Sequence, residues 1–162
     1  MRKAVAVFTV VLGVLALPGQ VFAQGMNPVV QEVRQTIQAS YAYSAENLED
    51  RPGDYSSEGS SEFWSSGGLR NAVPAGGEIG RTYVSFNMVP KYISVIPMGE
   101  DYATAMYYVE GSYQETGAAP VSNYFTRALQ VFVKEDGAWK IRAAHWSPVV
   151  GGTGTEQTAI VR

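Results

Sequence analysis

The sequence predicts an α+β fold in which one N-terminal helix is followed by antiparallel strands. Residues 28–48 carry apolar or small side chains three and four positions apart, which is typical of one face of a helix. Beyond residue 81, runs rich in β-branched and aromatic residues are separated by glycine-containing turns, which is typical of hairpins. These two observations place the helix before the sheet.

The predicted helix has recognisable start and stop signals. Asn27 precedes Pro28, which suits an N-cap followed by proline at the first helical position. Pro52 and Gly53 require the helix to end before them. Its buried face is formed by side chains at the expected spacing: Val30, Val33, Ile37, Tyr41, Ser44 and Leu48.

Strands are expected in most of the remaining chain. Residues 61–68 predict a short strand running into a glycine turn, and residues 68–80 are loop-like. Residues 81–89 fit either a strand or a short helix. Residues 91–97 and 101–113 predict a hairpin, and residues 123–147 predict two strands around an "EDG" turn.

The register of the last hairpin decides which side chains face the core. A three-residue loop at residues 135–137 pairs Val131 with Ile141 and Arg127 with His145. The alternative two-residue loop at Asp136–Gly137 sets Val131 and Leu129 against Arg142 and Ala144. Because the buried pattern sets the register, we prefer the three-residue loop.

This register directs Arg127 and His145, the only histidine, toward the core face. Two such groups at the end of an apolar face suggest the mouth of a pocket, since burying them unpaired is costly. Both also fit structural roles, His145 as a hydrogen-bond donor and Arg127 as a partner of a carboxylate. Aromatic side chains are available as walls: Tyr41, Tyr43, Trp64, Tyr107, Tyr108 and Trp146.

The N-terminus resembles a cleaved secretory signal. Arg2 and Lys3 precede an apolar run over residues 4–17, and small residues occupy the positions before a cut after Ala23. We therefore expect a signal peptide over residues 1–23, a domain over 24–150 and a tail or edge strand over 151–162. The mature protein is expected to be exported, either periplasmic or secreted, and without cysteine it has no disulfides.

Composition narrows the possible partners. Without Arg2 and Lys3, 10 basic residues face 15 acidic ones, a net charge of about −5 (10 − 15), which argues against nucleic acid or an anionic membrane as partner. One histidine and no cysteine make a zinc site improbable. There is no "GxSxG" serine motif, and no cofactor is predicted.

The segments "EFWSSGG" and "TRALQVFVKEDGAWKIRAAHWSP", preceded by the helix, resemble the nuclear transport factor 2-like superfamily, especially its SnoaL-like branch. The resemblance covers residues 29–148. It implies a cone-shaped barrel in which a strongly curved antiparallel sheet wraps around N-terminal helices and leaves a pocket at the open end. It also implies a possible homodimer through the outer face of the sheet. Members include isomerases, dehydratases, polyketide cyclases, epoxide hydrolases and binding modules, so the fold leaves function open.

The enzymes of this superfamily use different sets of catalytic residues, and each set can be compared with this sequence. Ketosteroid isomerase-like chemistry needs a carboxylate base and a tyrosine-plus-acid oxyanion hole, for which Glu110 is a candidate of undetermined orientation. The scytalone dehydratase-like set needs two histidines and is excluded. Epoxide-hydrolase-like chemistry needs an arginine bracketed by two acids, and Arg127 has no evident acid beside it. A metal-free carbonic anhydrase-like branch is similar only in His145 and Ser147.

The sequence thus predicts an exported protein that binds a small apolar or aromatic molecule, with Trp64, Tyr41, Tyr43, Tyr107 and Trp146 as the binding residues. The alternative is an isomerase, cyclase or lyase with His145 as acid or base and Arg127 holding negative charge. No complete catalytic set can be assembled from the sequence, which favours binding.

Overall fold

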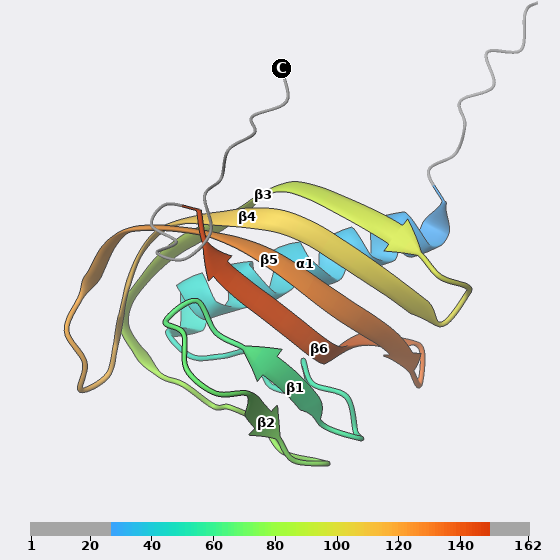
Figure 1. The fold of residues 1–162 in the computed structure, drawn as a ribbon, viewed down its shortest axis with the longest axis horizontal. Coiled ribbons are helices and arrows are strands. Elements are labelled where there is room, and N and C mark those ends of the chain that lie inside the picture. Colours follow the sequence, from blue (N-terminus) through green and yellow to red (C-terminus); the bar gives the residue numbers. More distant parts are fainter. Residues whose placement is uncertain (1–26, 150–162) are drawn as a thin grey trace, which may run out of the picture.

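The computed structural model describes residues 27–149, and the predicted signal peptide and tail lie outside these residues. One helix is followed by six strands in a single open sheet, with the order β2-β1-β6-β5-β4-β3. Figure 1 shows α1 lying across the concave side of the curved strands β3 to β5. The elements are α1 Pro28–Asn47, β1 Ser60–Phe63, β2 Asn71–Val73, β3 Tyr83–Pro97, β4 Tyr102–Glu115, β5 Val121–Glu135 and β6 Ala138–Pro148.

Both predicted ends of the helix are confirmed. The Asn27 side chain accepts a 2.9 Å hydrogen bond from the Val29 amide, and Pro28 is the first helical residue. Leu48 closes the helix in the left-handed conformation, with φ +57°. Val33 and Ile37 are buried under the sheet, as the spacing predicted.

The predicted strands exist, with two differences. Residues 83–89, left open between strand and helix, belong to β3, and the loop-like segment 68–80 contains β2. The hairpin between β3 and β4 is confirmed by the pairing of Pro97 with Ala103. The sheet is mixed rather than purely antiparallel, because β1 lies parallel to β6.

Gly111 helps the sheet to curve. It has φ +140° in the middle of β4, and a Cβ atom built there would lie 1.9 Å from the carbonyl oxygen of Asn87 on β3. Only glycine permits this approach of two backbones. Register shifts beside Gly111 in β4 and between Lys91 and Ser94 in β3 add to the bend.

The predicted register of the last hairpin is wrong. Asp136 and Gly137, with φ +49° and +80°, form a two-residue turn, so Glu135 pairs with Ala138 and Phe132 with Ile141. A β-bulge then leaves Arg142 without a partner in β5, and Val131 pairs with Ala143. The bulge avoids the pairing of Val131 with Arg142 that argued against this turn.

The corrected register reverses the predicted core face of β5. Ala128, Gln130 and Phe132 are buried, whereas Leu129 is 42% exposed. Arg127 pairs with Ser147 rather than with His145, and both Arg127 and His145 are exposed on the outer face. The prediction that these two side chains point inward together is therefore wrong.

Candidate functional site

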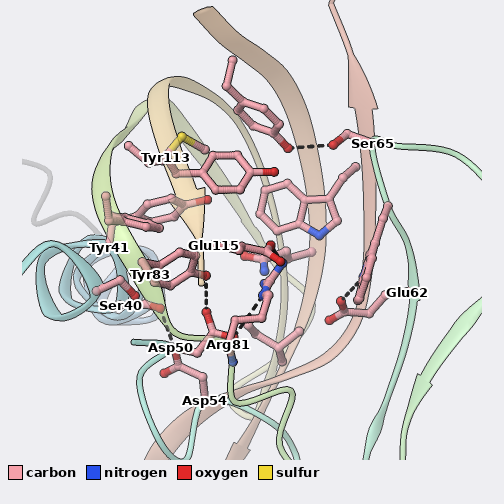
Figure 2. A pocket seen from close by; sticks show the side chains of 18 of the residues that line it. Ser40, Tyr41, Asp50, Asp54, Glu62, Ser65, Arg81, Tyr83, Tyr113 and Glu115 are labelled. Atoms are coloured by element: carbon pink, nitrogen blue, oxygen red, sulfur yellow. Dashed lines mark hydrogen bonds and ion pairs between the residues drawn. The ribbon is translucent and has the colours of Figure 1, made fainter. Parts of the chain in front are cut away.

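A cavity of about 400 Å³ lies between the helix and the concave face of the sheet. Its walls come from α1, the segment after it, β1, and the inner faces of β3 to β6. Figure 2 shows Tyr41, Tyr83 and Tyr113 on one side of the cavity and Glu62 across from them.

Aromatic rings form most of the apolar wall. Tyr107 is nearly fully buried at the centre, in edge-to-face contact with Trp146 (5.9 Å between centroids) and Tyr41 (6.4 Å). The Tyr107 hydroxyl donates a 2.7 Å hydrogen bond to Oε1 of Gln130, which is also buried. Burial raises the pKa of both the Tyr41 and the Tyr107 hydroxyls well above the ordinary value, so both stay neutral.

Arg81 lies between two carboxylates at the polar end of the cavity (Figure 2). Its Nε is 3.1 Å from Oδ2 of Asp50, and its Nη1 is 3.6 Å from Oε1 of Glu115. The Tyr83 hydroxyl donates a 2.5 Å hydrogen bond to the other oxygen of Asp50. Burial acts to lower the pKa of the guanidinium, but the charge and hydrogen bond of Asp50, together with Tyr83 and Tyr55, raise it overall. The guanidinium also lies over the Trp64 ring, 5.5 Å from its centroid.

Glu62 projects from β1 into the cavity and is 3% exposed. Its carboxylate accepts hydrogen bonds from Nε1 of Trp64 (2.9 Å) and Oγ of Ser60 (3.4 Å). Burial raises the pKa of this carboxyl group, and the Trp64 hydrogen bond and the Arg81 charge oppose the rise. A buried carboxyl with a raised pKa facing a cavity is suited to exchange a proton with a ligand.

Asp54, 7% exposed, is the second buried carboxyl of the cavity. Oγ of Ser40 donates a 2.5 Å hydrogen bond to its Oδ2. Nε of Arg51 lies 3.2 Å from Oδ1, yet Oδ1 accepts no properly directed hydrogen bond from the described residues. Burial raises the pKa of Asp54, opposed by Ser40 and Arg51.

The residues predicted as a site divide between the two faces of the sheet. Tyr41, Trp64, Tyr107 and Trp146 line the cavity. Tyr43 lies outside it and donates a 2.7 Å hydrogen bond to Glu49. Tyr108, also considered as a wall, is 41% exposed on the outer face.

Arg127 and His145 lie behind the cavity, on the convex side of the sheet. Nε of Arg127 donates a 2.8 Å hydrogen bond to Oγ of Ser147. The His145 ring lies beside the Phe63 ring, with 6.0 Å between the ring centroids. Glu110, the candidate base, forms an ion pair with Lys91 on this outer face. None of the three lines the cavity. Their position on the outer face argues against the catalytic role predicted for His145 and Arg127.

Sequence reasoning missed the charged residues of the cavity. Asp50, Asp54 and Arg81 belong to polar, glycine-rich connections whose side chains a periodic pattern cannot orient. One signal was available for Glu62, a carboxylate within a short strand. The arrangement required for epoxide-hydrolase-like chemistry, an arginine bracketed by two acids, occurs at Arg81 rather than at Arg127.

Solved structures identify the fold. The chain is similar to a ketosteroid isomerase-like protein from Erwinia carotovora atroseptica (14% identity, TM-score 0.55, covering 77% of this chain and 99% of the other). It is also similar to a nuclear transport factor 2-like protein of unknown function from Pseudomonas putida KT2440 (18% identity, TM-score 0.52, covering 74% of this chain and 86% of the other). A third similar structure is a nuclear transport factor 2-like protein of unknown function from Prochlorococcus sp. NATL2A (13% identity, TM-score 0.50, covering 75% of this chain and 94% of the other). No family model and no curated protein matches the chain.

The class of protein follows from these likenesses. The chain has the nuclear transport factor 2-like fold, an α+β cone, as the resemblance predicted. Its sheet is open and carries one described helix inside the cone, where several were expected. The SnoaL-like branch stays a prediction.

Proposed function

We propose that this protein binds a small, mainly apolar molecule inside the cone. The observation that carries the proposal is the cavity of about 400 Å³, lined by tyrosine and tryptophan rings together with a few charged side chains. Pockets of this size with apolar walls and a few convergent polar groups are typical of small-molecule sites. The predicted export of the protein would place this binding outside the cytoplasm.

A fluorescent probe tests this proposal. N-phenyl-1-naphthylamine is neutral and emits strongly only in apolar surroundings, so binding in the cavity would raise its emission. Ile141→Trp should weaken the signal, because Ile141 lines the cavity and the larger indole would take up part of its space.

The matched control is Ile96→Trp, which adds the same ring at a position 48% exposed. This variant should bind the probe as the unsubstituted protein does. Unchanged emission in Ile141→Trp, with its fold intact by circular dichroism, would place the probe elsewhere and overturn the proposal.

One arrangement favours a second candidate, an acid–base enzyme of the isomerase or dehydratase type. Glu62 is a buried carboxyl with a raised pKa that lines the cavity, as a general acid or base requires. One of the structures that share the fold is described as ketosteroid isomerase-like. In this candidate Glu62, rather than His145, transfers the proton.

Isomerisation of a β,γ-unsaturated ketone, followed by absorbance of the conjugated product, tests this candidate. Glu62→Gln should lower the rate by about 10²–10⁴-fold, the usual contribution of a general acid or base. Activity that survives in Glu62→Gln but is lost in His145→Ala would mean that His145, and not Glu62, transfers the proton.

We also propose that the outer face of the sheet is covered by a second copy of the chain. Met106, Tyr108, Phe125 and Leu129 are each more than 40% exposed and lie on neighbouring strands. An apolar group of this kind on a soluble domain is typical of an interaction surface. Sedimentation velocity should detect a dimer that Leu129→Arg dissociates while probe binding in the cavity is retained.

A further inference from the structure

The charges that line the cavity do not balance. Four carboxyl side chains and one guanidinium line it: Asp50, Asp54, Glu62, Glu115 and Arg81. Two cations outside the lining, Arg51 and Lys140, lie near Asp54, and Glu78 is a further acid there. Fully ionised, these groups carry five negative and three positive charges, a net charge of −2 (3 − 5).

Arg81 acts on Glu62 through its charge but forms no ion pair with it. Its guanidinium already faces two carboxylates, Asp50 at 3.1 Å and Glu115 at 3.6 Å. Glu62 itself forms no ion pair with any lysine or arginine of residues 27–149. Its hydrogen bonds come only from the neutral side chains Trp64 and Ser60.

Glu62 is therefore a carboxylate, 3% exposed, that faces a cavity without a cation of its own. Asp54 differs in this respect, because its Oδ1, although it accepts no hydrogen bond from the described residues, lies 3.2 Å from Nε of Arg51. Buried carboxylates are normally paired because their desolvation is costly. A positive group on a bound ligand would provide this pairing.

The surroundings of Glu62 suit a cation that carries an apolar body. The Trp64 indole donates a hydrogen bond to the Glu62 carboxylate, and the Tyr55 and Tyr107 rings line the same cavity. Aromatic faces attract organic cations, most strongly where water is excluded. Carboxylates beside such rings add charge-assisted hydrogen bonds to an ammonium.

We propose that the cavity binds an organic cation, with its positive group beside Glu62 and its apolar part against the ring walls. This inference rests on the proposed binding function and names the ligand class of the same cavity. It excludes an anion as the favoured ligand, because Arg81 is already neutralised by its two acids.

Three probes of similar shape and different charge test the inference: 2-phenylethylammonium, 2-phenylethanol and phenylacetate. Calorimetric titration of the purified protein should give a dissociation constant for the cation at least about tenfold below those of the other two. Glu62→Gln should remove this preference, because its amide keeps the shape and can still accept the Trp64 hydrogen bond. Glu110→Gln, which removes a carboxylate from the outer face, should leave the preference unchanged.

The outcomes separate the inference from the proposed function. If 2-phenylethanol or phenylacetate binds as tightly as the cation to the unsubstituted protein, the inference is wrong and the binding function stands. The same holds if Glu62→Gln is folded and keeps the preference. If none of the three binds while N-phenyl-1-naphthylamine does, the ligand is not a cation; if that probe also fails, both proposals are wrong.

Discussion

The two faces of the central strands are built from similar residues but have different surroundings. On the inner face, Tyr107 and Phe132 are 3% and 1% exposed, because α1 and the neighbouring strands cover them. On the outer face, Tyr108 and Leu129 are 41% and 42% exposed, and Tyr108 contacts the rings of Tyr92 and Phe125. Position in the curved sheet, rather than side-chain chemistry, decides which residues form the core.

The largest expected difference between the faces is in stability. Phe132→Ala should lower the free energy of unfolding by about 3–5 kcal/mol, because it leaves a void among packed side chains. Leu129→Ala should cost less than about 1 kcal/mol in the monomer. Urea denaturation of both variants measures the difference, and equal losses would mean that the outer face is as well packed as the inner one.

Neighbouring tyrosines give a sharper comparison. Tyr107→Phe removes the donor to Gln130 and leaves a buried acceptor unsatisfied, which should cost about 1–3 kcal/mol. Tyr108→Phe, one residue away on the other face, should be close to neutral. Thermal unfolding of the two variants tests whether the faces alternate here as the burial indicates.

The buried carboxyl group of Glu62 and the exposed one of Glu110 should also differ in how pH affects their contribution to stability. Burial raises the pKa of Glu62 in the folded protein, so its proton is held more tightly there than in the unfolded chain. Stability from this group is complete below its unfolded pKa, near 4.5, and is lost as the pH rises through the higher folded value.

Glu62→Gln should therefore be more stable than the unsubstituted protein at pH 8 and gain little at pH 4. Urea denaturation at both pH values measures this, with Glu110→Gln as the control for an exposed carboxylate in an ion pair with Lys91. A loss of stability in Glu62→Gln that is equal at both pH values would indicate a purely structural role.

The smallest expected effect concerns the outer polar pair. Arg127→Ala removes an exposed hydrogen bond to Ser147 and should change stability by less than about 0.5 kcal/mol. Probe binding in the cavity should not change, because Arg127 does not line it. Loss of binding in this variant would mean that the two faces are coupled.

The sequence was sufficient for the helix, its N-cap and the existence of the main hairpins, because each has a local or periodic signal. It was not sufficient to choose the inner face of β5. Leu129, Val131 and Val133 look more like a core than Ala128, Gln130 and Phe132 do, yet the second set is buried. Both faces are apolar enough to fit alternation, and only the wrapping of the sheet around α1 decides between them.

The carboxylates of the cavity were beyond prediction for another reason. Asp50 and Arg81 are 31 positions apart in the chain, and each lies in a connection rather than in a periodic element. Their meeting depends on how the segment after the helix packs against the start of β3. Contacts of this kind follow from the tertiary fold and leave no pattern in the local sequence.

The bulge at Arg142 has a consequence for how this fold can change. It sets which of two neighbours, His145 or Trp146, faces the cavity, because the side chains of a strand alternate. A single residue inserted or deleted between Ala143 and His145 would exchange them without any substitution. An indole wall would then be replaced by an imidazole, so chain length alone could give this cavity a titratable group or take one away.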